Sequence, residues 1–571
     1  MSVHGRRALL RLLAGLGATA GCRAAPLDRS FRSGAGEHAD LLIIGGPIWT
    51  MDPARPLVTA LATRNGRVLD LGEPTALTRL QGPRTRVLDL AGGLAVPGLT
   101  DAHAHLLGLG AVLEQVDLRG AASVDEVVAR VKQHAPESGW VLGRGWDQNL
   151  WPGAAMPTHD ALTTAFPDRP VWLRRVDGHA GWANRAALQA ARITATTPAP
   201  QGGEIPLRDG PVGREPTGLL VDAAMDLMPV PRADADALRR RILQAQAQVL
   251  PLGLTGIHEM GVSNDADMVL RALASSGDLR LRMTGYADED WFSRQVRHNM
   301  PERPGHDDRY ALVGVKLYVD GALGSRGAAL LAPYDDRPGH SGALQHSRAQ
   351  LGELVEVAVR GGWQVAAHAI GDRAIRELLD AFEAARKQVR RDEARRRDEA
   401  RLRVEHAQIV ALADIPRFAR LGAVASMQPT HATSDMAWVS ARIGAARLPG
   451  AYAWRRFLDA HVPLALGSDF PVEQPNPTHG LHAAMTRQDA AGQPRGGWLP
   501  DQRLTLGQAV AGFTSGAAFA AGQENWRGSL GLGMAADLTC FREDLRTRPP
   551  PTVRDAAILA TVIAGRVEWE A

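Results

Sequence analysis

Residues 94–105 read LAVPGLTDAHAH, an apolar run that leads into two histidines. The apolar part, residues 94–99, predicts a short buried strand. Because side chains alternate between the two faces of a strand, we expect His103 and His105 to project together from its end. Two neutral imidazoles side by side suit a divalent transition metal. An exposed strand can also show His-x-His by chance, so the pair needs support from the rest of the chain.

The bulk composition sets limits on the class of protein. The chain has 571 residues, of which 45% are hydrophobic and 22% charged, as in ordinary globular proteins. This length allows one large α/β barrel and a smaller domain. The net charge is only +3 and no basic stripe is interleaved with aromatic residues, so nucleic-acid binding is not expected. With Cys22 and Cys540 as the only cysteines, a metal site must use His, Asp, Glu or Lys.

The N-terminus has the pattern of a targeting segment. Arg6 and Arg7 precede a Leu/Ala/Gly-rich stretch, which resembles a bacterial twin-arginine export signal. We therefore expect residues 1–25 to be an export signal and the protein to reach the periplasm or the outer face of the membrane. Cys22 lies in a context similar to a lipoprotein processing site, but Thr19 replaces the usual leucine. A plain cleavable signal is favoured, and a lipid anchor is the alternative. No later segment reaches the ~20 apolar residues of a transmembrane span.

The pattern of strands and helices predicts the fold. Short strands separated by turns at both chain ends predict a β-sandwich domain composed of residues 38–93 and 521–571. Residues 94–520 alternate strands with helices, which predicts an α/β fold with a TIM-like (β/α)8 barrel. The candidate strands are residues 94–99, 171–176, 256–258, 281–284, 313–318, 364–367, 402–404, 423–426 and 463–466. They are one too many for eight, so an insertion is expected around residues 115–228. The charged run 386–403 predicts a solvated helix.

Other candidate strands also end in residues that can bind a metal. The residues concerned are Lys316, His368, His406 and Asp469. Catalytic residues of barrels lie at the C-terminal ends of the strands. A single histidine in such a place is more often a hydrogen-bonded core residue, but the whole set in this order predicts a shared site.

This order of residues resembles that of the amidohydrolase superfamily. Several strings are more specifically similar to the branch that contains N-substituted formamide deformylases. These strings are Asp177-Gly178-His179-Ala180, Lys316-Leu317-Tyr318-Val319-Asp320-Gly321-Ala322, His368-Ala369-Ile370-Gly371-Asp372 and Ser468-Asp469-Phe470-Pro471-Val472. The likeness extends from about residue 39 to about residue 567. It implies a hydrolase of carbon–nitrogen bonds other than peptide bonds, with a small-molecule substrate.

The resemblance also implies a ligand set. His103 and His105 would hold one metal ion together with Asp469, and His368 and His406 would hold a second. Zinc is the expected ion, and one ion or two are compatible with the residues. Lys316 would react with carbon dioxide to form a carbamate that bridges the ions. The alternative is a lysine that reaches solvent or pairs with Asp320.

Mechanism follows from these ions. A metal ion makes hydroxide available at neutral pH, and Asp469 can pass the proton to the leaving nitrogen of an amide. The same site could act on a lactone, a carbamate or a cyclic amide, or as a deaminase. A further alternative is an exported protein that binds a metal or ligand without catalysis. The oligomeric state stays open, and a homodimer is compatible with the sequence.

Other residues are weaker candidates. His179, Trp146 and His431 are candidates for substrate contact. His258 ends a strand and is expected near the metal ligands or in the core. Glu405, next to His406, is expected to point to the opposite face and to have a structural role.

Overall fold

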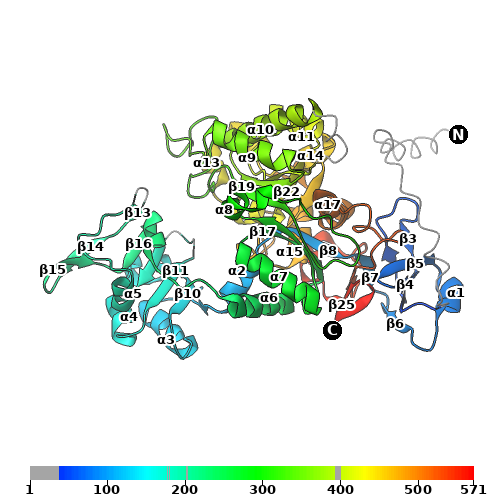
Figure 1. The fold of residues 1–571 in the computed structure, drawn as a ribbon, viewed down its shortest axis with the longest axis horizontal. Helices are drawn as coiled ribbons and strands as arrows, with labels where there is room; N and C mark the ends of the chain where they lie inside the picture. The colour runs from blue at the N-terminus through cyan, green and yellow to red at the C-terminus, as the bar shows by residue number, and fades with distance from the viewer. Residues whose placement is uncertain (1–37, 177, 179, 201–202, 392–399) are drawn as a thin grey trace.

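The computed structural model describes residues 38–176, 178, 180–200, 203–391 and 400–571. The expected export signal 1–25, including Cys22, lies outside these residues. Figure 1 shows three bodies in a row, with a central barrel between an inserted α/β unit and a domain built from both chain ends. Within the described ranges, no helix is long and apolar enough to cross a membrane.

The centre of the molecule is an eight-stranded sheet in which each strand pairs in parallel with the next. Its strands are β8 (Leu99–Ala104), β17 (Leu254–Val262), β18 (Arg282–Ala287), β19 (Tyr310–Tyr318), β20 (Gln364–Ala369), β21 (Leu402–His406), β22 (Val424–Met427) and β23 (Leu464–Leu466). The last strand, β23, lies against β8 and nearly closes the barrel. The predicted TIM-like fold is confirmed.

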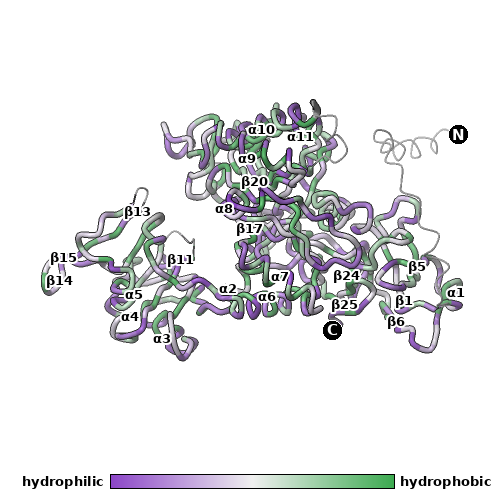
Figure 2. Tube along the Cα trace, viewed as in Figure 1, coloured by the Kyte–Doolittle hydropathy of each residue, from purple (hydrophilic) through white to green (hydrophobic). Residues whose placement is uncertain are grey.

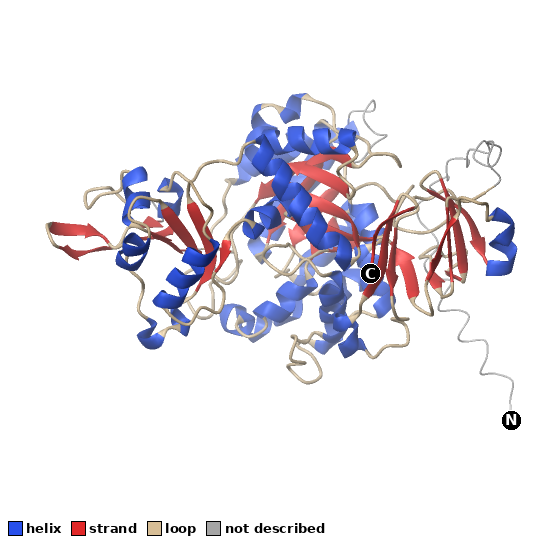
Figure 3. Cartoon of the chain, turned by 90° about the horizontal axis from the view of Figure 1, so that it is seen from below, coloured by secondary structure: helices blue, strands red, loops and turns tan. Residues whose placement is uncertain are grey.

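Helices cover the outside of this barrel, as Figure 3 shows from below. They include α2 (Leu106–Leu113), α6 (Ala235–Val249), α7 (Asn264–Ser276), α8 (Glu289–Arg294), α9 (Arg348–Arg360), α10 (Asp372–Arg391), α11 (Ile415–Leu421), α13 (Val439–Arg447), α14 (Trp454–Asp459), α15 (Pro477–Thr486), α16 (Leu506–Phe513) and α17 (Ser515–Ala520). Helix α12 (Pro429–Asp435) instead lies at the C-terminal ends of the strands, just after β22. Along α6, hydrophobic and hydrophilic residues alternate in Figure 2, and Ile242 and Val249 are among those buried. This amphipathic pattern packs one face of the helix on the barrel.

The charged run 386–403 is not one helix. Its first part belongs to α10, residues 392–399 lie outside the described residues, and β21 begins at Leu402. Arg403 is therefore fully buried in a barrel strand.

The domain built from both chain ends contains two sheets. One has the order β5-β4-β1-β6 and the other β26-β25-β24-β7-β2-β3. The bounds are β1 (Leu41–Ile44), β2 (Ile48–Trp49), β3 (Leu57–Val58), β4 (Ala60–Arg64), β5 (Arg67–Gly72), β6 (Arg86–Asp89), β7 (Leu94–Pro97), β24 (Leu538–Phe541), β25 (Ile558–Ile563) and β26 (Arg566–Glu570), with the short helix α1 (Pro74–Leu77). The pairing of β7 with β24 joins the two chain ends.

The expected first barrel strand, residues 94–99, is thus divided between two sheets. Leu94–Pro97 pairs antiparallel with β24, and the barrel strand starts at Leu99. The residue between them is Gly98, where a Cβ would lie 2.2 Å from Thr255 Oγ1, so only glycine fits this close approach. The apolar run alone could not reveal this division, because both strands are buried.

The inserted unit has a sheet of its own, in the order β13-β16-β12-β11-β10-β9. Its elements are β9 (Val116–Asp117), α3 (Val124–His134), β10 (Val141–Trp146), α4 (Asp160–Ala165), β11 (Val171–Arg175), β12 (Ala180–Ala183), α5 (Arg185–Ala190), β13 (Gly203–Glu204) and β16 (Leu219–Asp222), with a hairpin of β14 (Leu207–Gly210) and β15 (Gly213–Pro216). The candidate strand 171–176 therefore belongs to this unit and not to the barrel.

Candidate metal centre

The histidine pair lies at the C-terminal end of the first barrel strand. His103 is inside β8 and fully buried, and His105 directly precedes α2. His105 Nε2 lies 3.1 Å from Asp469 Oδ1, and His103 Nε2 lies 3.5 Å from the same oxygen. The two imidazoles therefore converge on one carboxylate, as the spacing predicted.

His406 and His368 complete a cluster of imidazoles. The ring centre of His406 lies 4.7 Å from that of His103 and 4.6 Å from that of His368. Burial lowers the pKa of His103 to about 4 and that of His368 to about 3. These two rings are therefore neutral near pH 7, which is the form that binds metals.

A left-handed backbone places two neighbouring residues of β21 at the site. His406 has φ +71°, whereas simple alternation would send it and Glu405 to opposite faces. Glu405 Oε2 accepts a hydrogen bond from His103 Nδ1 at 2.6 Å. The expectation that Glu405 points away from the site is therefore wrong, because its face of the strand is the barrel interior.

Asp469 is held by contacts of the loop after β23. Its backbone N–H donates to His103 O at 2.7 Å, and the preceding Ser468 donates its Oγ–H to Asp101 Oδ2 at 2.6 Å. Burial alone would raise the pKa of Asp469, but the surrounding imidazoles, His103 first, hold it well below its ordinary value. The carboxylate is thus charged, which is the form that binds cations.

Lys316 lies within β19 and is 1% exposed. Burial lowers its pKa to about 8, against the opposing charges of Glu405 and Asp469. Its Nζ lies 3.1 Å from His103 Nε2. Asp320, the alternative partner, instead accepts the backbone N–H groups of Ala329, Ile370 and Gly371.

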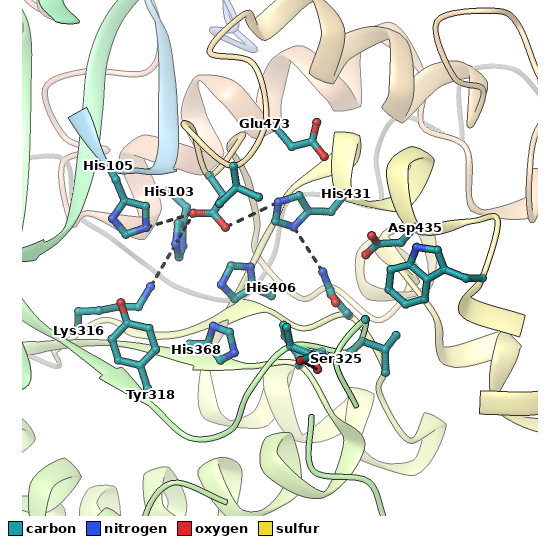
Figure 4. A pocket seen from close by; sticks show the side chains of 18 residues that line it. His103, His105, Lys316, Tyr318, Ser325, His368, His406, His431, Asp435 and Glu473 are labelled. Atoms are coloured by element: carbon teal, nitrogen blue, oxygen red, sulfur yellow. Dashed lines mark hydrogen bonds and ion pairs between the residues drawn. The ribbon is translucent and has the colours of Figure 1, made fainter. Parts of the chain in front are cut away.

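These side chains surround a cavity of about 920 Å³. Figure 4 shows His103, His105, Lys316, His368 and His406 around it. They come from β8 and the residue that follows it, and from β19, β20 and β21. Ligand atoms of His103, His406 and Asp469 lie within 4.8 Å of one another. His368 Nε2 is buried without a hydrogen-bond partner. This donor set of imidazoles and carboxylate fits a divalent metal such as zinc.

The three candidates for substrate contact have different outcomes. His431, on α12, lines the cavity with Nε2 3.7 Å from Asp469 Oδ2. Trp146 is fully buried in the core of the inserted unit, stacks on Trp151 and donates to Leu173 O, so its expected place in the substrate pocket is wrong. His179 lies outside the described residues.

The far wall of the cavity was not anticipated from the sequence. It carries Asp435, Trp438 and Glu473, which come from α12, the turn before α13 and the loop after β23. Tyr452 donates its O–H to Asp435, and Ser434 donates to Glu473 Oε1 at 2.6 Å. No local pattern marks these residues, because only the fold brings the three segments together.

Comparison with known proteins agrees with this geometry. The sequence profile of the amidohydrolase family matches residues 86–568. The chain belongs to this family. Protein LONG AFTER FAR-RED 3 of Arabidopsis thaliana is 34% identical, over 94% of this chain and 93% of its own length. An N-substituted formamide deformylase of Arthrobacter pascens is 29% identical, over 93% and 98% respectively. The crystal structure of a metal-dependent hydrolase from Pyrococcus furiosus has a TM-score of 0.74 at 28% identity and covers 90% of this chain and 99% of that one.

Proposed function

We propose that this amidohydrolase cleaves the C–N amide bond of a small N-acyl compound, with N-substituted formamides as the first class to test. The observation that carries the proposal is the grouping of ligand atoms of His103, His406 and Asp469 within 4.8 Å of one another at the wall of one cavity. The similarity to an N-substituted formamide deformylase over nearly the whole chain supports the choice of bond.

His103, His105 and Asp469 would hold one zinc ion, and His368 and His406 a second. Bound zinc supplies a Lewis acid and a water molecule acidic enough to lose a proton near neutral pH. The buried amine of Lys316, once deprotonated, can add carbon dioxide and release a proton, which gives a carbamate with two oxygen ligands.

Asp469 is the proton carrier in this proposal. Its charged carboxylate lies at the cavity wall between His105 and His431. It can take a proton from water and deliver it to the amide nitrogen, which leaves as a neutral amine. His431 and Ile370 line the same cavity, so the substrate would lie against them.

The test is hydrolysis by zinc-loaded protein of N-formyl and N-acetyl amines, lactones, carbamates and cyclic amides, with the released amine or acid measured directly. We expect N-formyl amines to be the best substrates and Asp469→Asn to lose at least about 100-fold in kcat, the lower range for a general acid–base residue. The matched control is Asp414→Asn, a buried carboxylate that pairs with Arg376 and Arg417 on the outside of the barrel. Preferred turnover of lactones or release of ammonia would contradict the proposed bond. Full activity of Asp469→Asn would contradict its role.

A further inference from the structure

A layer of polar side chains crosses the barrel directly beneath the metal centre. It consists of His258, Tyr286, Arg403, Glu405 and Ser426, and all five are 0% exposed. We refer to these residues as the polar layer. They come from four strands, β17, β18, β21 and β22. Burying charged groups requires an unfavourable desolvation free energy. If this part of the barrel served only for packing, aliphatic residues would make it at least as stable.

Arg403 is the centre of the layer. Its guanidinium donates to Glu405 at 2.7 and 3.2 Å, to Tyr286 Oη and His258 Nδ1 at 2.9 Å each, to Ser426 Oγ at 3.0 Å and to Ala102 O at 2.5 Å. Every guanidinium nitrogen thus has a partner. A lysine could not supply these contacts, because its ammonium lacks the planar fork of donors.

Glu405 connects the layer to the metal centre. Its carboxylate faces Arg403 on one side and His103 Nδ1, at 2.6 Å, on the other. A carboxylate only accepts hydrogen bonds, so Nδ1 of His103 must carry the proton. The lone pair of the ring is then on Nε2, the atom that points toward Lys316 and Asp469.

We propose that Arg403 and Glu405 are positioning residues that fix the tautomer and the ring angle of His103, and thereby set the affinity of the centre for zinc. The proposal uses the assignment of His103 as a metal ligand but not the identity of the substrate. Partners of this kind typically change metal affinity by 10–100-fold when they are replaced.

The experiment measures zinc dissociation constants by competition with a chromophoric chelator, for metal-free full-length protein. Glu405→Gln places an amide next to His103 and removes the charge that holds Arg403. We expect a 10–100-fold weaker zinc affinity and a changed visible spectrum of the cobalt-substituted protein. Arg403→Met should have a similar effect, and Arg403→Lys a smaller one, because the charge is kept.

The matched control is Asp537→Asn. Asp537 forms another buried pair, with Arg282 at 2.7 Å, but this pair joins the start of β18 to the domain built from both chain ends. We expect this variant to lower the melting temperatures of metal-free and zinc-loaded protein alike, with zinc affinity unchanged. If Glu405 had a purely structural role, Glu405→Gln would likewise lower both melting temperatures and leave the zinc affinity unchanged.

A zinc affinity of Glu405→Gln within about twofold of wild type would overturn the proposal, because replacing a residue that orients a metal ligand typically weakens metal affinity by about tenfold or more. If this variant does not fold, Arg403→Met replaces it, and a zinc affinity within about twofold of wild type with an unchanged cobalt spectrum would overturn the proposal equally. Wild-type protein that binds zinc tightly but hydrolyses no amide would contradict the proposed function and leave this inference intact.

Discussion

Glu259 gives a prediction about stability that depends on pH in a direction fixed by the structure. It lies in β17, is 2% exposed, and accepts the backbone N–H of Leu106 at 2.6 Å. Leu106 begins α2, whose preceding residue His105 supplies no side-chain cap. Glu259 therefore caps, from another strand, the helix that follows His103 and His105.

Burial raises the pKa of Glu259 from 4.5 to about 7, although His105 and the N–H groups of Leu106 and Leu107 oppose this. Between these two pH values the folded state holds the proton and the unfolded chain has lost it. The contribution of Glu259 to the free energy of unfolding is therefore fully present below about pH 4.5 and is lost as the pH rises to about 7. At 1.36 kcal/mol per pH unit, the loss between about pH 5 and about pH 8 is roughly 2–3 kcal/mol.

Glu259→Gln keeps an acceptor for Leu106 but does not titrate. In metal-free protein, we expect it to melt close to wild type near pH 5 and several degrees above it near pH 8. Glu259→Ala loses the cap and should melt below Glu259→Gln at both pH values. Glu302→Gln is the control, because Glu302 also accepts a backbone N–H, from Leu312, but is partly exposed. An advantage of Glu259→Gln that does not grow between the two pH values would refute the reasoning.

Three further predictions follow from burial and from the N-terminal sequence. Burial raises the pKa of the Cys540 thiol to about 12, so a Cys22→Ser protein should not react with a thiol reagent near pH 8 until denaturant is added. Trp146→Ala should cost about 3–5 kcal/mol of stability, measured by denaturation, yet leave KM for the amide substrate unchanged, because Trp146 is a core residue of the inserted unit. We also propose export by the twin-arginine route, so replacing Arg6 and Arg7 by lysine should keep the protein out of the periplasmic fraction of a bacterial host; unchanged secretion would contradict this.

The strand-end residues that line the cavity could be predicted from the sequence because each belongs to a local pattern. An apolar run followed by a histidine, lysine or aspartate is visible without the fold, as at Lys316 and His368. The barrel itself followed from the alternation of strands and helices. The rest depended on contacts between distant segments, such as Asp101 with Ser468 or Glu259 with Leu106.

Some errors had local causes that a sequence hides. Simple alternation failed at Glu405 and His406, because a left-handed residue rotates the end of β21. An indication of this arrangement is still visible in the sequence. Arg403 and Glu405 are two residues apart in an apolar strand, so they share one face, and two charged side chains in a buried strand require polar partners. The tryptophans near residue 146 resembled a pocket lining but form a core of their own. Composition alone does not distinguish these two roles.

The central claim is a metal centre bounded by the strand-end residues. It is tested most directly by anomalous diffraction at the zinc absorption edge, from crystals of protein reconstituted with zinc. The account predicts a peak within bonding distance of His103, His406 and Asp469, the three residues whose ligand atoms converge within 4.8 Å. The absence of a peak at this point, or a peak only elsewhere in the molecule, would contradict the account.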